Sequence, residues 1–254
     1  MITVKSQREL DLMRKAGHIV AMAHRRIEEL IAPGITTKEL DKAAEEVIVK
    51  LGGIPSFKGV PNPYGGIDFP ASICASVNHE VIHGIPNDIP LKEGDIVSID
   101  IGAIYEGYHG DAARTYEVGV VSPEARRLIT VTRESFYKGI EMAKEGMRIR
   151  DISRAIQQYV EGNGYSIVRD FVGHGIGTEM HEEPQIPNFV TRERGPRLQK
   201  GMTLAIEPMV NEGHWAVDLL KNNWTVVTRD RKLSAHYENT IAITENEPEI
   251  LTKY

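Results

Sequence analysis

The sequence predicts a single α+β domain, residues 1–254, made of two related halves at about 1–120 and 121–254. Three observations support this prediction. Helical stretches in each half precede apolar strand-like segments, a segment of the first half repeats in the second without a gap, and no Ser/Pro-rich linker separates the copies. A chain of 254 residues with 41% hydrophobic side chains is long enough to bury a core.

The first third of the chain predicts two helices. Ser6 and Glu9 have the spacing of a capping box, and apolar residues then recur at steps of three and four until the Pro-Gly turn at 33–34. Thr36 and Glu39 repeat the capping box before a second apolar stripe, which a pair of glycines ends.

A strand and its hairpin partner follow a segment rich in Pro, Gly and Asn. Residues 96–103 read IVSIDIGA, in which Val97, Ile99 and Ile101 would share one face while Asp100 takes the other. Residues 110–118 are the expected partner strand. Ser122-Pro123 then begins a third helix, with Ser as cap and Pro at the first helical position.

The second half repeats the first at matching positions. Helical segment 34–52 aligns with 146–164, and both end in Gly. The two following alignments pair acids with acids: residues 93–102 with 200–209, which sets Asp100 against Glu207, and residues 109–115 with 236–242, which sets Asp111 against Glu238. The sequence therefore predicts one duplicated helix–helix–sheet unit.

This repeat predicts a metal site. If the halves pack about a pseudo-twofold axis, the four acids converge, and without a counterion they would repel and lose hydration. Two divalent cations would balance their charge. His174, within the run GHGIG, is the expected imidazole ligand, and a His among carboxylates favours a transition metal over Mg²⁺ or Ca²⁺.

The other histidines carry less information. Any one strand Asp or lone His is more often a hydrogen-bonded or solvated residue than a ligand, and only the conjunction of two acids per half with His-Gly-Ile twice favours a site. His109 and His236 adjoin the candidate ligands and are expected to support them from outside. His18, His24 and His214 have no such neighbours.

Composition excludes several classes of protein. The sequence contains no run of 18 apolar residues, so no membrane span is expected. The N-terminus has no continuous apolar segment typical of a signal peptide. A single cysteine, Cys74, fits a reducing cytoplasm. The net charge of −6 argues against a specific nucleic-acid partner. We expect a cytoplasmic monomer.

Five motifs resemble the type I methionine aminopeptidases of the short bacterial kind. The motifs are HGIP (83–86), DIVSIDIGA with GYHGDAART (95–115), GHGIGTEMHEEP (173–184), MTLAIEP (202–208) and LSAHYENTIAIT (233–244), and the resemblance runs over nearly the whole chain. The N-terminus has no Cys/His cluster typical of a zinc-binding extension. No long helical insertion separates His181 from Glu207, unlike in the type II branch.

The resemblance implies a pita-bread fold and a role for each residue. Asp100 would chelate one of two divalent ions, Asp111 and Glu238 would bridge both, and His174 and Glu207 would complete the other. Such a site accepts Mn, Fe, Co, Ni or Zn, among which cellular supply decides. A water molecule would be the nucleophile. Glu207 would accept and relay the proton of this water. His181 would stabilise the oxyanion, and His83 would contact the substrate amide and assist its leaving nitrogen.

The resemblance also implies the substrate. The enzyme would remove the initiator methionine from nascent proteins and peptides whose second residue is small, with a transient contact to the ribosome as a further partner. The apolar methionine pocket would be formed by Phe69, Cys74, Trp224 and Tyr64. Asn78 and Ser234 match positions that help to hold a monovalent cation in relatives.

Two alternatives stay open at this point. One is another pita-bread metallopeptidase, specific for proline, although such relatives usually carry an additional N-terminal domain and this chain begins with the first helix of the catalytic unit. The other is a binding protein that kept the fold and lost catalysis. Loss of any one of the five candidate metal ligands would favour the non-catalytic binding protein, and all five residues are present.

Overall fold

The computed structural model describes residues 2–253. Within them the first half of the chain contains two helices followed by five strands: α1 (Gln7–Leu30), α2 (Thr37–Lys50), β1 (Ile54–Pro55), β2 (Ile73–Val77), β3 (Glu80–Ile82), β4 (Ile96–Tyr105) and β5 (Tyr108–Glu117). The second half begins with two helices and three strands: α3 (Pro123–Ile140), α4 (Ile149–Gly162), β6 (Ser166–Ile167), β7 (Gly173–Gly175) and β8 (Glu182–Ile186). Seven short strands complete it: β9 (Thr203–Ile206), β10 (Met209–Asn211), β11 (Val217–Leu219), β12 (Val226–Thr228), β13 (Ser234–His236), β14 (Asn239–Ala242) and β15 (Glu249–Ile250).

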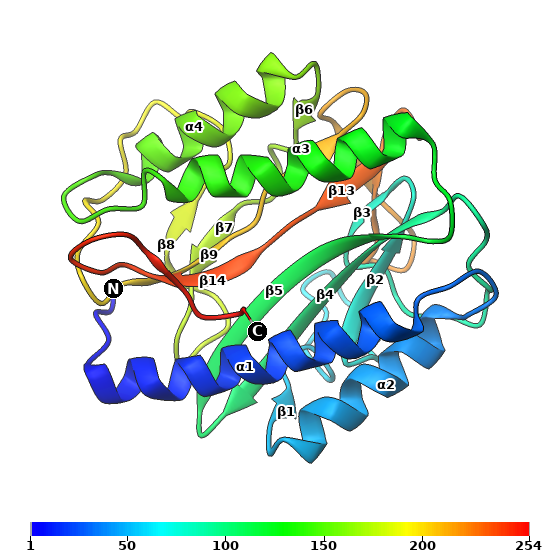
Figure 1. Ribbon diagram of the computed structural model, residues 1–254, viewed down its shortest axis with the longest axis horizontal. Coiled ribbons are helices and arrows are strands. Elements are labelled where there is room, and N and C mark those ends of the chain that lie inside the picture. The colour runs from blue at the N-terminus through cyan, green and yellow to red at the C-terminus, as the bar shows by residue number, and fades with distance from the viewer. Residues whose placement is uncertain (1, 254) are drawn as a thin grey trace.

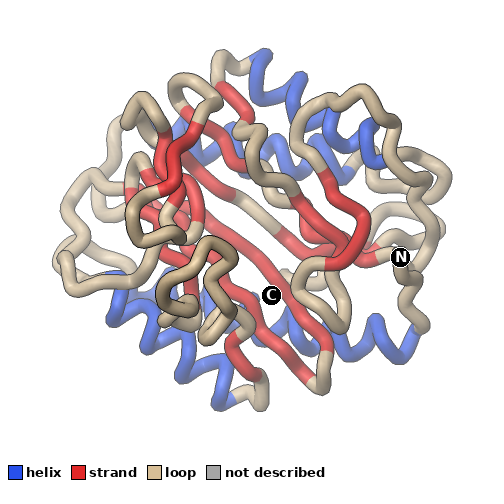
Figure 2. Tube along the Cα trace, turned by 180° about the vertical axis from the view of Figure 1, so that it is seen from behind, coloured by secondary structure: helices blue, strands red, loops and turns tan. Residues whose placement is uncertain are grey.

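The two helix pairs lie at opposite edges of the molecule with the strands between them (Figure 1). Seen from behind, strands and loops face the viewer and the helices lie beyond them (Figure 2). Helices α2 and α4 begin and end at positions that the sequence repeat equates. The prediction of an α+β fold made of two helix–helix–sheet halves is confirmed.

Local signals set the helix starts as expected. Ser6 Oγ accepts from Glu9 N while Glu9 Oε2 accepts from Ser6 N at 2.7 Å, and Thr36 with Glu39 makes the same reciprocal pair. Ser122 Oγ accepts from the third residue of α3. These caps satisfy backbone donors that would otherwise lack partners in the first turn.

The antiparallel sheet of the first half brings two acids together. A two-residue turn of Glu106 and Gly107, both with positive φ, joins β4 to β5. In the resulting register Asp100 lies opposite Ala113, and Asp111 lies opposite Gly102. Because residues directly opposite share a face, both carboxylates lie on the same face of the sheet.

The other face of this sheet packs against α1 and α2. The buried core there combines alternate residues of β4 with the apolar stripes of both helices: Val97, Ile99, Ile101, Ile19, Ile27, Leu40 and Ile48. A separate core of the second half packs α3 and α4 against β9, β10, β13 and β14. The acids thus lie on the strand face that the helices leave free.

The strands of the second half are interrupted at both acids. Glu207 lies between β9 and β10, and Glu238 lies between β13 and β14. Pro208 lacks an amide hydrogen, so it cannot donate to a strand ladder. Glu238 instead exchanges backbone hydrogen bonds with Ala113 of β5, at 2.9 and 3.3 Å. This crossing joins the two halves.

Candidate metal centre

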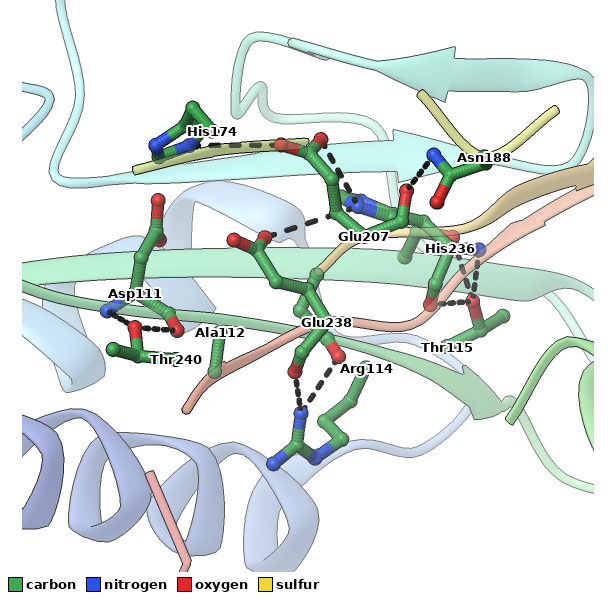
Figure 3. A network of polar contacts seen from close by, with 12 residues as sticks. Asp111, Ala112, Arg114, Thr115, His174, Asn188, Glu207, His236, Glu238 and Thr240 are labelled. Carbon is green, nitrogen blue, oxygen red and sulfur yellow. Dashed lines mark hydrogen bonds and ion pairs between the residues drawn. The ribbon is translucent and has the colours of Figure 1, made fainter. Parts of the chain in front are cut away.

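A cavity of about 420 Å³ lies between the two halves. Its lining includes all five candidate metal ligands: Asp100, Asp111, His174, Glu207 and Glu238. Each comes from a different segment: β4, β5, β7 and the two strand breaks after β9 and β13. Figure 3 shows Asp111, His174, Glu207 and Glu238 gathered around the same space. The structure therefore brings together the acids that the repeat had paired.

Two overlapping groups of side chains have ligand atoms within 4.8 Å of one another. The first contains Asp111, His174 and Glu238, and the second contains Glu207, His236 and Glu238. His174 Nε2 is 3.5 Å from Glu207 Oε1, which links the two groups. Glu238 belongs to both groups.

The buried acid oxygens are chemically suited to cations. Within residues 2–253, Asp100 Oδ1, Asp111 Oδ1 and Glu238 Oε1 are inaccessible to solvent and have no hydrogen-bond partner. A buried acceptor without a donor is costly, and a bound cation removes that cost. The donor set of carboxylates with imidazole fits divalent transition metals.

Burial also disfavours the charged form of these acids. It raises the pKa of Asp100 to about 7 and raises the pKa of Asp111, Glu207 and Glu238 well above ordinary values. Repulsion between neighbouring carboxylates raises the last three pKa values further. Such a cluster can be fully ionised at neutral pH only if positive charge lies among the carboxylates.

The His174 tautomer is set by its own backbone. Its Nδ1 is 2.8 Å from the carbonyl oxygen of Gly175, which can only accept, so Nδ1 carries the hydrogen. Burial lowers the pKa of His174 to about 4, so the ring is neutral. Nε2 therefore presents a lone pair toward Glu207, in the orientation that a metal ligand needs.

Two further histidines line the same cavity. His181 follows β7 and its ring centroid is 4.4 Å from that of His174. His83 follows β3 with a left-handed φ of 57° and makes an edge contact with Phe171. Burial lowers the pKa of both imidazoles, that of His83 to about 4. Each is therefore neutral near pH 7 and can donate one N–H.

His236, which the resemblance did not assign as a ligand, lies beside the acids. It is buried, and Nε2 lies 3.8 Å from both Glu207 Oε2 and Glu238 Oε2, without a hydrogen-bond partner within residues 2–253. Burial lowers its pKa to about 3. Its position two residues before Glu238 in the sequence was the signal that predicted a supporting role.

The apolar end of the cavity contains three of the four predicted pocket residues. Phe69, Cys74 and Trp224 are buried together, with the Phe69 and Trp224 rings edge to face at 5.2 Å. The structure does not bring Tyr64 there, which corrects the fourth assignment: Tyr64 is absent from the cavity lining and 67% exposed. Its amide donates to Asn62 Oδ1, which turns this loop outward.

Sequence reasoning missed other residues of the pocket wall. Phe57, Val60, Pro61 and Pro63 line the cavity and come from the irregular segment after β1. Nothing in the pattern of this segment indicates which side chains turn inward. Met180 also lines the cavity and precedes His181.

The residues proposed for a monovalent cation are neighbours. Ser234 N donates to the carbonyl oxygen of Asn78 at 2.9 Å, and Asn78 has a left-handed φ of 55°. The Asn78 side chain is engaged with Asp95 and the amide of Ile96.

A site of buried carboxylates and imidazole between two halves of an α+β fold is typical of metallohydrolases. The model of metallopeptidase family M24 matches residues 11–245. The chain belongs to this family and, within it, to the methionine aminopeptidases. The methionine aminopeptidase of Clostridium perfringens is 59% identical over 252 residues, 99% of each chain, and methionine aminopeptidase 1 of Bacillus subtilis is 56% identical over both full lengths.

Solved structures give the same result. The methionine aminopeptidase of Thermotoga maritima matches with a TM-score of 0.95 at 49% identity, covering both chains completely. The prolidase of Pyrococcus furiosus matches with a TM-score of 0.79 at 25% identity, and 65% of that chain is covered. The pita-bread fold is confirmed, and the identities favour a methionine aminopeptidase over the proline-specific alternative. No helix among the described residues is long and apolar enough to cross a membrane.

Proposed function

We propose that the protein removes N-terminal methionine from nascent proteins and peptides when the second residue is small. The observation that carries the proposal is the cavity whose lining combines the acid cluster with the buried apolar side chains of Phe69, Cys74 and Trp224. A methionine side chain in the apolar end would place the adjoining peptide bond near the acids.

Two divalent ions per chain are part of this proposal. Asp100 would hold one ion, Asp111 and Glu238 would be shared, and His174 with Glu207 would hold the other. When bound, such ions lower the pKa of water and polarise a carbonyl group. M24 metallopeptidases use divalent metals, and the unpartnered acid oxygens support the same requirement here.

The chain's own residues supply the remaining chemistry. Glu207, whose carboxylate lines the cavity, would accept a proton from the attacking water and pass it on. His181, a neutral imidazole on the cavity wall, would donate to the oxyanion that forms on the scissile carbonyl oxygen. His83 would contact the substrate amide and assist departure of its nitrogen.

The pocket favours an unbranched, polarizable side chain. Phe69, Cys74 and Trp224 offer no polar partner to a charged group, whose loss of hydration would be uncompensated. A thioether packs well against aromatic rings. Burial and the neighbouring acids raise the pKa of Cys74, so its thiol stays neutral in the pocket.

The wider setting is inferred with the activity. We place a single catalytic domain over residues 1–254, acting as a monomer in the cytoplasm with transient access to the ribosome. Asn78 and Ser234 would contribute to a monovalent-cation site through the carbonyl that links them.

A panel of synthetic peptides tests the substrate. Met-Gly and Met-Ala peptides are expected to release methionine, Met-Lys and Met-Trp peptides to be cleaved far more slowly, and N-acetyl-Met-Ala hardly at all. A larger second side chain would crowd the histidines, and a blocked amine cannot bind beside Asp100. Amino-acid release at matched concentrations is the measurement. Preferred cleavage of an Xaa-Pro bond would instead assign the chain to the proline-specific group.

His236→Ala is expected to weaken metal affinity about 10–100-fold, because the polar imidazole nitrogen that faces the Glu207 and Glu238 carboxylates at 3.8 Å would be lost. His236→Gln should retain most of the affinity, since its amide can also donate. Titration calorimetry with Mn²⁺ measures both, with His79→Ala, outside the cavity, as control. Unchanged affinity in His236→Ala would show that Nε2 supports neither carboxylate.

A further inference from the structure

The turn that carries His181 is fastened from outside the cavity by the N-terminal segment. We call residues 177–182 the His181 turn. Lys5 Nζ is 2.5 Å from Glu182 Oε2, and Thr3 Oγ1 donates to the same oxygen at 2.6 Å. Both charged side chains are nearly buried, at 5% exposure for Lys5 and 9% for Glu182. This ion pair joins the chain before α1 to the start of β8.

The ion pair packs directly on the backbone of the turn. A Cβ atom at Gly177 would come within 2.4 Å of Glu182 Oε1 and 2.7 Å of Lys5 Nζ, so both charged groups rest on this glycine. Glu182 Oε1 also accepts from Glu179 N at 3.4 Å, within the turn. The backbone of Lys5 is itself held, because its amide donates to Gly201 O at 2.8 Å.

The His181 imidazole depends on this backbone for its position. Within residues 2–253 its ring makes no hydrogen bond, and its ring contact is with His174. A donor to a developing oxyanion must be placed precisely, and a displacement of about 1 Å can cost about 10²-fold in rate. Glu182, which adjoins His181, is held by its pairing with Gly175 of β7 and, through its side chain, by the ion pair with Lys5.

A buried ion pair is poor evidence for stability alone, because its desolvation cost can equal its attraction. We propose that Lys5 is a positioning residue for catalysis: its ion pair with Glu182 fixes the His181 turn so that the His181 imidazole faces the substrate carbonyl. This inference rests on the proposed role of His181. It gives the segment before α1 a function in the reaction, although it lies outside the cavity.

Coupling between Lys5 and His181 tests the inference. In the metal-loaded protein, Lys5→Met is expected to lower kcat on a Met-Ala peptide by about 10–10²-fold, with little change in KM and full metal content. Lys5→Arg, which keeps the charge, should recover most of the rate. In a His181→Ala background, Lys5→Met should lower kcat no further, because the group that it positions is absent.

Two variants control for a merely structural effect. Arg14→Met removes the ion pair between α1 and Glu249, in which no residue of the His181 turn takes part, and should leave kcat unchanged. If Lys5→Met does not fold because Glu182 is left buried and unpaired, Lys5→Met/Glu182→Leu removes both charges and should fold with the same loss of kcat.

The outcomes separate this inference from the proposed function. Additive losses in the Lys5→Met/His181→Ala variant, or wild-type kcat in the variant that lacks both charges, would overturn the positioning role. Wild-type kcat in His181→Ala alone would instead overturn the role proposed for His181. Equal losses of kcat in Arg14→Met and Lys5→Met would show that the loss comes from general destabilisation, and would contradict the positioning role.

Discussion

Glu238→Gln is expected to lose nearly all activity together with bound metal. Glu238 belongs to both groups of candidate ligand atoms, so its replacement by a neutral amide removes a charge from both. Metal assistance is worth several kcal/mol of the barrier, which corresponds to a rate loss of about 10³-fold or more. Elemental analysis and release of methionine from a Met-Ala peptide measure the two losses.

A matched control and metal removal accompany this variant. Glu80→Gln replaces a half-buried carboxylate that accepts from Val77 N, outside the cavity, and should keep both metal and activity. Dialysis of the unmodified protein against a strong chelator should abolish turnover, and Mn²⁺, Co²⁺ or Fe²⁺ should restore it. Full turnover in protein shown to be metal-free would refute the proposal of two ions.

His181→Ala is expected to keep fold and metal but lower kcat about 10²–10³-fold, the cost of removing one oxyanion donor. The imidazole lines the cavity beside His174 but belongs to neither group of candidate ligand atoms. Steady-state kinetics on the Met-Ala peptide, with metal content measured on the same sample, is the test.

An exposed histidine on α1 supplies the comparison. His18→Ala should leave both kcat and metal content unchanged. If His181→Ala instead lost its metal while the turnover per remaining ion stayed the same, the roles of ligand and oxyanion donor would have to be exchanged between histidines.

The helices and the first hairpin were predictable because their determinants are local. The capping pairs Ser6–Glu9 and Thr36–Glu39 act over three residues, and they are formed as the sequence indicated. The strand pattern around Asp100 and the two-residue turn before β5 likewise fix which face the first acid pair shares. Such signals do not depend on the rest of the chain.

The convergence of the second acid pair was predicted by analogy between the halves, but its backbone was not. Glu207 and Glu238 lie in strand breaks, and Glu238 is hydrogen-bonded to Ala113 of the other half. In the sequence, the alternation of apolar and polar residues continues through Glu238, so the strand break is not visible there. The backbone partner of Glu238, Ala113, is 125 residues away along the chain. Only packing of the halves reveals that partner.

The sequence by itself determined the two related halves, and it predicted five acid and imidazole side chains that line the cavity, while the family resemblance supplied Phe69, Cys74 and Trp224. Tertiary structure decided that Tyr64 turns outward while Phe57 turns inward, and that Lys5 is buried against Glu182. The physical reason is the separation along the chain of the residues that interact. Periodicity and caps report interactions within a few residues, whereas burial of a loop side chain or a charge depends on which distant surface covers it.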